Sequence, residues 1–425
     1  MANIKKIFAY EIIDSRGYPT IEGRLIMDNG VEVFTSVPSG TSVGKYEAFE
    51  LRDTNIPRID GMGVTQAVSY INDLIGPKLV GISPLKQQEI DYWLIKADNT
   101  KNKSRLGSNT TLTISQLIAK AGATDQNIPL YKYINFLYKQ IFRSEIPIEK
   151  IPTPIFNIIN GGRHSNNNLE FQEFQIVPSS SLSYEQAFLS AIEIFHELKR
   201  MLEYRNANTS VGVEGGFTPN FSTNVDALEV ILETINHRNL KIGYDVFLGL
   251  DIAASNFYKD EKYHIKDRTH PLKPEEYFDF IETLIKKYSI LVLEDPIQED
   301  DWSNWKKLTE KIASEVYVVG DDLLATNKDR VTTAIKEKAC TTVLIKPNQI
   351  GTITETLEVI DLARKNNMSC IVSHRSGETN DSFIADFAVG VQSLFVKFGA
   401  PSRGERVAKY NRLWQIYREE LKPKP

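Results

Sequence analysis

From residue 246 onward, short apolar runs alternate with amphipathic stretches, and each run stops at a charged residue. The residues that end these runs are Asp251, Glu294, Asp321, Lys346, His374 with Arg375, and Lys397. From Glu294 onward the charged ends recur roughly every 25 residues, about the length of one strand and one helix in a (β/α)-barrel. Buried parallel strands present such residues at their C-terminal ends. The pattern therefore predicts a barrel with acidic and basic side chains at one mouth.

The first 142 residues follow a different order, with strands first and helices afterwards. Apolar and polar residues alternate over 20–27 and 31–36, and Asp28-Asn29-Gly30 between them is a strong hairpin signal. Helical spacing follows over 64–75, stopping near Gly76-Pro77, and then over 83–97, 109–122 and 130–142. This order predicts a separate α+β domain at 1–142. A linker at 143–150 leads into a second domain, 150–425.

The start of the second domain carries polar loops between its predicted elements. Apolar strands are expected at 151–159 and 171–177, long helices at 183–204 and 223–237, and a last helix at 407–421. The loops between them hold Gly161-Gly162-Arg163-His164 and a glutamate, Glu214, with glycines on both sides. Gln172 and Glu173 lie in the second strand. By itself the Gly-Gly-Arg-His segment indicates only a flexible loop.

Composition narrows the classes of function. The chain has 425 residues and a net charge of −5, which argues against a dedicated nucleic-acid binder because such proteins carry a basic excess. No apolar run reaches 18 residues, so we expect no membrane span. The two cysteines, Cys340 and Cys370, lie in or beside apolar runs and are expected to be buried free thiols in a reducing compartment.

Three acids at strand ends suggest a metal site. Asp251, Glu294 and Asp321 each stand at the end of an apolar run, so they occupy matching positions on their strands. Their carboxylates are hard oxygen ligands, which suit Mg²⁺. Zinc is disfavoured because no His/Cys cluster accompanies them. The alternative is that such acids cap the helices that follow, and Asp295, Asp301 and Asp322 are candidates for that role.

Basic residues at the neighbouring strand ends suggest an anionic substrate. Lys346 follows a fully apolar strand, where partial burial and nearby cations can lower its pKa enough for a base; otherwise it reaches solvent or pairs with an acid. Arg375 and Ser376 offer a planar fork and a hydroxyl, which together suit a phosphate or carboxylate. Lys397 adds a second positive charge. The set predicts a small substrate with several negative charges.

Glu214 is a candidate general acid. Its flanking glycines let backbone approach a ligand closely, and a second carboxylate such as Glu173 nearby would raise its pKa. The alternative is an exposed turn, which is the commoner setting for a glycine-flanked glutamate.

Taken together, these segments resemble the enolase (phosphopyruvate hydratase) family over essentially the whole chain. The matching motifs are Asp14–Gly17 with Pro19–Thr20, Ser39–Gly40 with Ser42, Glu50–Asp53, Asn160–Gly162 with His164, Gln172–Phe174, Glu214–Gly216, Ser289–Trp302, Gly320–Leu323, Lys346 with Asn348–Thr352, Ser373–Thr379, and Lys397 with Gly399–Pro401. So many long motifs in the same order make the resemblance specific.

The resemblance implies an α/β barrel of the TIM type with an antiparallel start, preceded by a smaller α+β domain that caps it. It also implies a cytoplasmic homo-oligomer, either a dimer or a ring of dimers such as an octamer. The implied activity is the glycolytic, reversible dehydration of 2-phospho-D-glycerate to phosphoenolpyruvate by a magnesium-assisted lyase. Two Mg²⁺ ions per active site are implied, since they stabilise the charge that makes so weak an acid give up its proton.

Each site residue takes a role by its position in the motifs. Asp251, Glu294 and Asp321 match the ligands of the first magnesium, and Ser42 matches a ligand of the second. The matched catalytic residues are Lys346 as the base at C2, Glu214 with Glu173 as the acid at C3, and the pocket histidines His164 and His374. The matched substrate-binding residues are Gln172, Glu173, His164, Arg375, Ser376 and Lys397.

The chain departs from the family pattern beside several motifs. Val213 stands before the acid where aspartate is usual, and Val43 stands beside Ser42 where threonine is usual; Tyr18, Asn256, Pro347, Phe398 and the segment Thr110–Ile114 are also unusual. We therefore hypothesise an active enzyme with reduced turnover. The alternatives are a weakly catalytic paralogue that binds host or surface proteins, reaching the cell surface without a signal peptide, and a dehydratase for sugar acids that lack phosphate.

Overall fold

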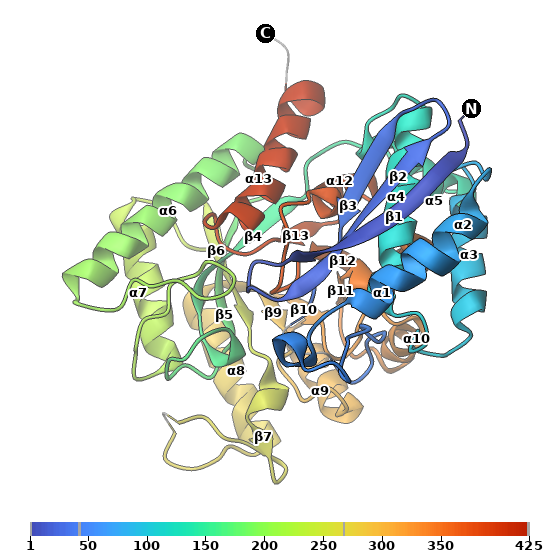
Figure 1. The fold of residues 1–425 in the computed structure, drawn as a ribbon. Coiled ribbons are helices and arrows are strands. Elements are labelled where there is room, and N and C mark those ends of the chain that lie inside the picture. The colour runs from blue at the N-terminus through green and yellow to red at the C-terminus, as the bar shows by residue number, and fades with distance from the viewer. Residues whose placement is uncertain (1, 41–43, 267, 423–425) are drawn as a thin grey trace.

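The computed structural model describes residues 2–40, 44–266 and 268–422. The N-terminal unit is built on a three-stranded antiparallel sheet of β1 (Ile4–Ile13), β2 (Pro19–Met27) and β3 (Glu32–Ser36), blue in Figure 1. The predicted hairpin joins β2 and β3. Gly30 has a φ of +87° there, and its N–H donates to the Met27 carbonyl.

Helices cover this sheet and fill the rest of the N-terminal unit. Their bounds are η1 (Arg58–Gly61), α1 (Thr65–Ser69), the π-helix η2 (Tyr70–Ile75), α2 (Gly76–Leu79), α3 (Gln87–Asp98), α4 (Ser108–Asp125) and α5 (Leu130–Phe142). The helix expected to stop near Gly76-Pro77 instead runs on to Leu79. A wide turn, in which the Gly76 N–H donates to Ile71, precedes Pro77, and the proline falls in the first turn of α2 where its missing N–H costs nothing.

Helix α4 is buried along most of its length, between the sheet and the neighbouring helices. Its polar threonines are tolerated because their hydroxyls bond to the helix itself. Thr113 donates to the Asn109 carbonyl at 2.7 Å, and Thr111 donates to the Ser108 carbonyl at 3.2 Å.

The larger unit is a closed barrel, as predicted. Among the described residues its strands run β4 (Thr153–Asn160), β5 (Glu173–Pro178), β6 (Val246–Asp251), β9 (Ile290–Glu294), β10 (Tyr317–Gly320), β11 (Thr342–Ile345), β12 (Ser369–Ser373) and β13 (Phe395–Lys397), which closes on β4. The pairs β4–β5 and β5–β6 are antiparallel and the remaining pairs are parallel. The antiparallel start is therefore confirmed.

Apolar side chains fill the barrel interior, and helices surround it. The interior side chains are Ile155, Val177, Val292, Val319, Leu344, Ile371 and Phe395. The outer elements are α6 (Tyr184–Tyr204), α7 (Asn224–His237), α8 (Pro274–Tyr288), α9 (Trp302–Ile312), α10 (Lys328–Glu337), α11 (Ile353–Lys365), α12 (Phe383–Gly390) and α13 (Gly404–Ile416) with the π-helix η6 (Tyr417–Leu421). Short pieces lie in the loops: η3 (Gly162–His164), η4 (Ala254–Asn256), η5 (Pro347–Gln349), β7 (Tyr258–Lys259) and β8 (Lys262–Tyr263).

The N-terminal unit lies against the barrel on the side of the later strands, as Figure 1 shows. Ser39 and Gly377 form an antiparallel bridge between the two units. The Ser15 N–H also donates to the Glu378 carbonyl at 2.8 Å. The segments that follow β1 and β3 therefore reach the segment that follows β12.

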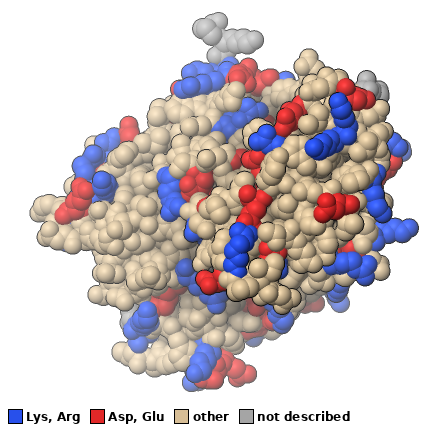
Figure 2. Space-filling view, viewed as in Figure 1, with Lys and Arg blue, Asp and Glu red and all other residues tan. Residues whose placement is uncertain are grey.

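Three further expectations concern the two cysteines, membrane spans and the charge of the surface. Cys340 and Cys370 are buried free thiols, as predicted, and burial raises their pKa values to about 12 and about 11. No helix within the described ranges is long and apolar enough to cross a membrane. Figure 2 shows basic and acidic side chains interspersed on one face, without a continuous basic stripe.

Candidate active site

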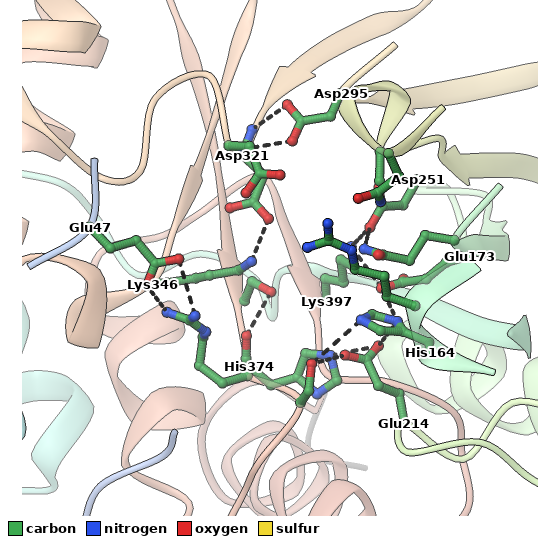
Figure 3. A pocket seen from close by; sticks show the side chains of 18 residues that line it. Glu47, His164, Glu173, Glu214, Asp251, Asp295, Asp321, Lys346, His374 and Lys397 are labelled. Carbon is green, nitrogen blue, oxygen red and sulfur yellow. Dashed lines mark hydrogen bonds and ion pairs between the residues drawn. The ribbon is translucent and has the colours of Figure 1, made fainter. Parts of the chain in front are cut away.

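A polar cavity of about 590 Å³, counting its open mouth, lies at the C-terminal end of the barrel strands. Figure 3 shows charged side chains converging on it from several strands. The cavity is lined by Glu47, Arg163, His164, Gln172, Glu173, Glu214, Asp251, Ala253, Asn256, Asp295, Asp321, Asp322, Lys346, Ser373, His374, Arg375, Ser376 and Lys397. Most of the predicted site residues are thus brought together in one place.

The phase of the apolar runs explains this convergence. Asp251, Glu294 and Lys397 are the last residues of β6, β9 and β13. Asp321 and Lys346 come directly after β10 and β11. Because β6 and β9 pair in parallel with Asp251 opposite Glu294, the two acids are neighbours across the ladder. Ser42 lies outside the described residues.

Two lysines neutralise the carboxylates of this cluster. Lys397 Nζ lies 2.8 Å from Glu294 Oε2, and 3.2 Å from both Asp251 Oδ2 and Glu173 Oε1. Lys346 Nζ lies 2.5 Å from Asp321 Oδ2. Each lysine thus has a carboxylate partner at charge-assisted distance, the Lys397 group buried and the Lys346–Asp321 pair partly exposed.

The pKa of Lys346 differs from the sequence expectation. Burial would lower the pKa of Lys346, but the Asp321 carboxylate outweighs it and raises that pKa. The expectation of a lowered pKa was therefore wrong for this arrangement, since nothing in the sequence pairs this lysine with that acid. Its alternative, pairing with an acid of the metal set, is what the structure shows.

The carboxylate cluster suits a hard cation. Burial and the neighbouring Asp251 carboxylate raise the pKa of Glu294 well above its usual range. Such crowding of buried acids at strand ends is relieved by positive charge, and oxygen donors are those that Mg²⁺ prefers. The donor chemistry of Asp251, Glu294 and Asp321 therefore suits the predicted ion. Among the described residues, however, the acids whose oxygens lie within 4.8 Å of one another are Asp295, Asp321 and Asp322.

Asp295, Asp301 and Asp322 were candidate helix caps, and one of them caps a helix. The Asp301 side chain accepts from the Asn304 N–H at the start of α9. Asp295 instead accepts from the backbone N–H groups of Asp321 and Asp322, at 2.9 and 2.7 Å. It fixes the turn that carries a proposed ligand, a role that no local sequence pattern indicates.

Glu173 and Glu214 meet in the cavity, as predicted, and Glu173 lies opposite Asp251 across the β5–β6 ladder. A carboxylate oxygen of Glu173, a carboxylate oxygen of Glu214 and a ring nitrogen of His164 all lie within 4.8 Å of one another. His374 Nε2 lies 3.3 Å from Glu214 Oε2, and Asn157 donates to the same oxygen at 3.2 Å. Both glutamates are buried, so Glu214 is not the exposed turn of the alternative interpretation.

The sequence led us to expect a raised pKa for Glu214, but the structure raises the pKa of Glu173 and lowers that of Glu214. Burial and the Glu214 carboxylate raise the pKa of Glu173 well above its usual range. Burial would raise the pKa of Glu214 too, but the imidazole rings of His164 and His374 hold it well below its usual range. The expected raised pKa of Glu214 was therefore wrong here. His164 Nδ1 lies between the two acids, 3.5 Å from Glu173 and 3.7 Å from Glu214, whereas His374 faces Glu214.

The candidate anion clamp holds a carboxylate of the protein. Arg375 donates to Glu47 Oε2 at 2.7 Å and to Glu47 Oε1 at 3.2 Å, and it also donates to Asn348. Ser376 Oγ donates to Glu214 at 3.2 Å. The fork of Arg375 thus already recognises two oxygens of an anion. Sequence reasoning missed Glu47, which has no strand or helix pattern around it.

The last predicted contact is that of Gln172. Its side-chain amide donates to Asp251 Oδ2 at 3.1 Å, so the amide borders the acid cluster. Sequence reasoning also missed Arg406, at the start of α13, whose guanidinium reaches the His374 ring and three backbone carbonyls. Its only signal was an arginine directly before the helix predicted at 407–421.

Comparison with known proteins places this geometry in a family. Two family models match the chain: "Enolase, C-terminal TIM barrel domain" at residues 149–424, and "Enolase, N-terminal domain" at residues 4–134. The chain belongs to the enolase family. It is similar to proteins named enolase in Ehrlichia canis (46% identical over 416 residues; 98% of this chain and 96% of the relative), and in Natranaerobius thermophilus (45% over 419 residues; 99% and 96%). Membership makes this enolase-family chain an enzyme, a hydro-lyase of the phosphopyruvate hydratase class.

Proposed function

We propose that this enolase-family protein catalyses the reversible dehydration of 2-phospho-D-glycerate to phosphoenolpyruvate. The observation that carries the proposal is the cavity that Lys346 and Glu214 share. Asp251 and Asp321 also line it, and Glu294, which is not among its lining residues, is paired with Lys397. A proton abstraction and the departure of a hydroxyl group need a base and an acid around one substrate. Lys346 and Glu214 line one cavity and are the candidates for these two roles, which supports the proposal.

The proposed cofactor is a pair of Mg²⁺ ions. Asp251, Glu294 and Asp321 would hold the first ion, and Ser42 would be a ligand of the second. When bound, they would supply positive charge against the charge that develops on the substrate. Asp321, the charge partner that now raises the pKa of Lys346, would be one of the residues that hold an ion.

The chain's own residues supply the remaining chemistry. Lys346 would take the proton from C2, and Glu214 with Glu173 beside it would protonate the hydroxyl that leaves C3. Arg375 and Ser376 would hold the phosphate, since the Arg375 fork already binds an anion of similar geometry in Glu47. Lys397 and Gln172 would lie against the substrate carboxylate, and His164 and His374 would border the pocket.

The first test compares the parent protein with Lys346→Ala. Conversion of 2-phosphoglycerate in the presence of magnesium is followed by the ultraviolet absorbance of phosphoenolpyruvate. We expect the variant to lose at least about 10³-fold in kcat, in the range of general acid–base contributions. Lys336→Ala, which removes an exposed lysine from α10, is the matched control. Equal turnover of the parent and Lys346→Ala would contradict the proposed base.

A second candidate function rests on Val213, which stands directly before the acid. In this alternative the protein keeps the fold, turns over weakly and acts as a surface protein that binds host or other proteins. Absence of turnover in the parent protein with magnesium bound would favour it.

Under the main proposal the protein is cytoplasmic and has two structural units, 1–142 and 150–425. We also propose that it assembles as a dimer or a ring of dimers, which light scattering after size-exclusion chromatography would measure.

A further inference from the structure

Arg406 is a fully buried arginine that the proposed chemistry does not use. It lies in the first turn of α13, and its side chain has no exposed surface. A buried guanidinium is costly unless its donors are paired, so its partners indicate what it does. Glu405 offers it partial charge compensation, with an oxygen 3.4 Å from Nε.

Four acceptors surround the two terminal nitrogens of Arg406. One nitrogen donates to His374 Nδ1 at 2.7 Å and to the Arg375 carbonyl at 2.6 Å. The other donates to the Val213 carbonyl at 3.0 Å and to the Ser376 carbonyl at 2.6 Å. One side chain therefore holds the segment before Glu214 and the segment that carries the anion clamp.

The contact with His374 determines the tautomer of that ring. A guanidinium is a donor only, so the Nδ1 that faces it must be an acceptor and carries no proton. The ring proton of a neutral imidazole then lies on Nε2, which is 3.3 Å from Glu214 Oε2. Burial lowers the pKa of His374 to about 3, with Arg406 acting in the same direction, so the ring is neutral at ordinary pH.

Packing at Gly399 indicates how little room this arrangement has. A Cβ placed on Gly399 would lie 2.7 Å from the Glu214 carbonyl oxygen, 3.0 Å from Arg406 Cδ and 3.0 Å from His374 Cε1. The Glu214 carbonyl, two side chains and this glycine thus form one tight junction.

We propose that Arg406 is a positioning residue that locks His374 as the Nε2–H tautomer facing Glu214. The ring then presents its one N–H toward the acid, with Nε2 3.3 Å from Glu214 Oε2, and has no unprotonated nitrogen on that side to take a proton from it. In the same contact, the backbone of the clamp is tied to the backbone of the acid loop. The kinetic part of this proposal rests on the proposed function, whereas the tautomer does not.

The first test is spectroscopic and needs no variant. With ¹⁵N-labelled histidine, the two ring nitrogens of His374 are expected to show an unprotonated Nδ1 and a protonated Nε2 across pH 6 to 8. The signals are assigned by their loss in His374→Gln, among the six histidines of the chain. A protonated Nδ1 in the unmodified protein would overturn the proposal, whatever the enzyme assays show.

The second test removes the guanidinium. Arg406→Met is expected to give mixed tautomers of His374 and to reduce kcat by about 100-fold, within the range of one misplaced acid–base group. If that variant does not fold, Arg406→Lys serves instead, because one ammonium cannot reach all four acceptors. In a chain that already carries His374→Ala, the same change should cost less than about 5-fold, since residues that act through one another are not additive.

Lys409→Met is the matched control for the loss of a buried cation. Lys409 is also fully buried in α13, and it donates to the Thr379 and Glu405 carbonyls. It is expected to lower stability but to leave the His374 ¹⁵N signals unchanged. Equal kcat losses from Arg406→Met in the parent and in the His374→Ala chain would show a merely structural role and overturn the proposal.

Discussion

Val213 lines a neighbouring cavity with Arg163, Arg403 and Asn208, and it is not among the residues that line the central one. Its carbonyl, held by Arg406, fixes the chain just before the acid. A side chain at this position can therefore influence Glu214 by charge without entering the substrate cavity.

This gives a prediction for Val213→Asp. A carboxylate beside Glu214 raises the pKa of that acid, which favours the protonated form that a general acid needs. We expect kcat at pH 7 to rise several-fold, measured by the phosphoenolpyruvate absorbance. Val213→Asn, which has the same shape without the charge, should not show the rise. A rise in both variants, or in neither, would show that the missing charge beside Glu214 does not limit turnover.

At the level of residues, the sequence predicts the members of the site better than their pairing. The apolar runs predict that Asp251, Glu294 and Lys397 belong to the site, because the end of each strand fixes where its last side chain points. Which lysine neutralises which acid depends on the closed barrel, so the Lys346–Asp321 pair could not be foreseen. Glu47 could not be foreseen either, since it acts from the other unit.

Among the elements, the segment from η2 to α2 shows a local signal overruled by packing. Gly76 and Pro77 together predict the end of a helix, yet the chain continues for another turn. The reason lies outside the helix. A Cβ at Gly76 would lie 2.7 Å from the Ile7 carbonyl oxygen of β1, so glycine is required for the helix to approach the sheet.

We therefore expect Gly76→Ala to destabilise the protein although alanine is the better helix former. Overpacking against backbone atoms costs about 1–3 kcal/mol, more than the roughly 1 kcal/mol gained in helix propensity. The free energy of unfolding is measured in urea. Lys78→Ala, an exposed position in α2, should change it by less than about 0.5 kcal/mol. A stabilised Gly76→Ala variant would show that the sheet can move away.

For the whole molecule, one buried network joins the N-terminal unit to the barrel. Asp91 of α3 accepts from the Thr354 N–H and hydroxyl of α11, at 3.0 and 2.6 Å, and from Gln87. Burial raises the pKa of Asp91 above its usual range. A raised folded pKa contributes stability that is complete below the unfolded pKa of about 4 and is lost as the pH rises through the folded value.

The expected result is a pH-dependent difference between the parent and Asp91→Asn. The asparagine does not titrate, so the unfolding free energy of the parent minus that of the variant should fall as the pH rises from 4. Urea unfolding at a series of pH values measures it. Asp329→Asn, at an exposed position of α10, is the control and should give a constant difference. A difference that grows with pH would mean that Asp91 is stabilised as the carboxylate.

The carboxylate cluster at the barrel mouth gives a second prediction at this scale. A cation that binds only the folded state stabilises it by about 2.7 kcal/mol at 100 times its Kd. We expect magnesium to raise the Tm of the metal-free protein and chelation to reverse the shift and abolish turnover. Glu294→Gln should lose most of the magnesium-dependent shift in Tm. If the Tm of the parent protein does not change when magnesium is added, the proposed ligands are contradicted.

The fold itself was largely predictable at this scale, and the boundary of the last helix was not. The regular spacing of charged strand ends predicts the barrel, whereas the helix expected at 407–421 begins at Gly404. Those first residues carry Arg406, and its role depends on loops nearly two hundred residues earlier in the chain. Interactions so distant in sequence leave no local periodicity.

The position of α13 has a consequence for synthesis. A chain that stops before Gly404 already contains every strand of the described barrel, together with the acids and lysines at its mouth. It lacks the guanidinium that orients His374 and joins the acid loop to the clamp. A truncated product would thus keep the barrel's strands and the charges at its mouth while being catalytically poor. Competence is acquired only once translation has passed Arg406.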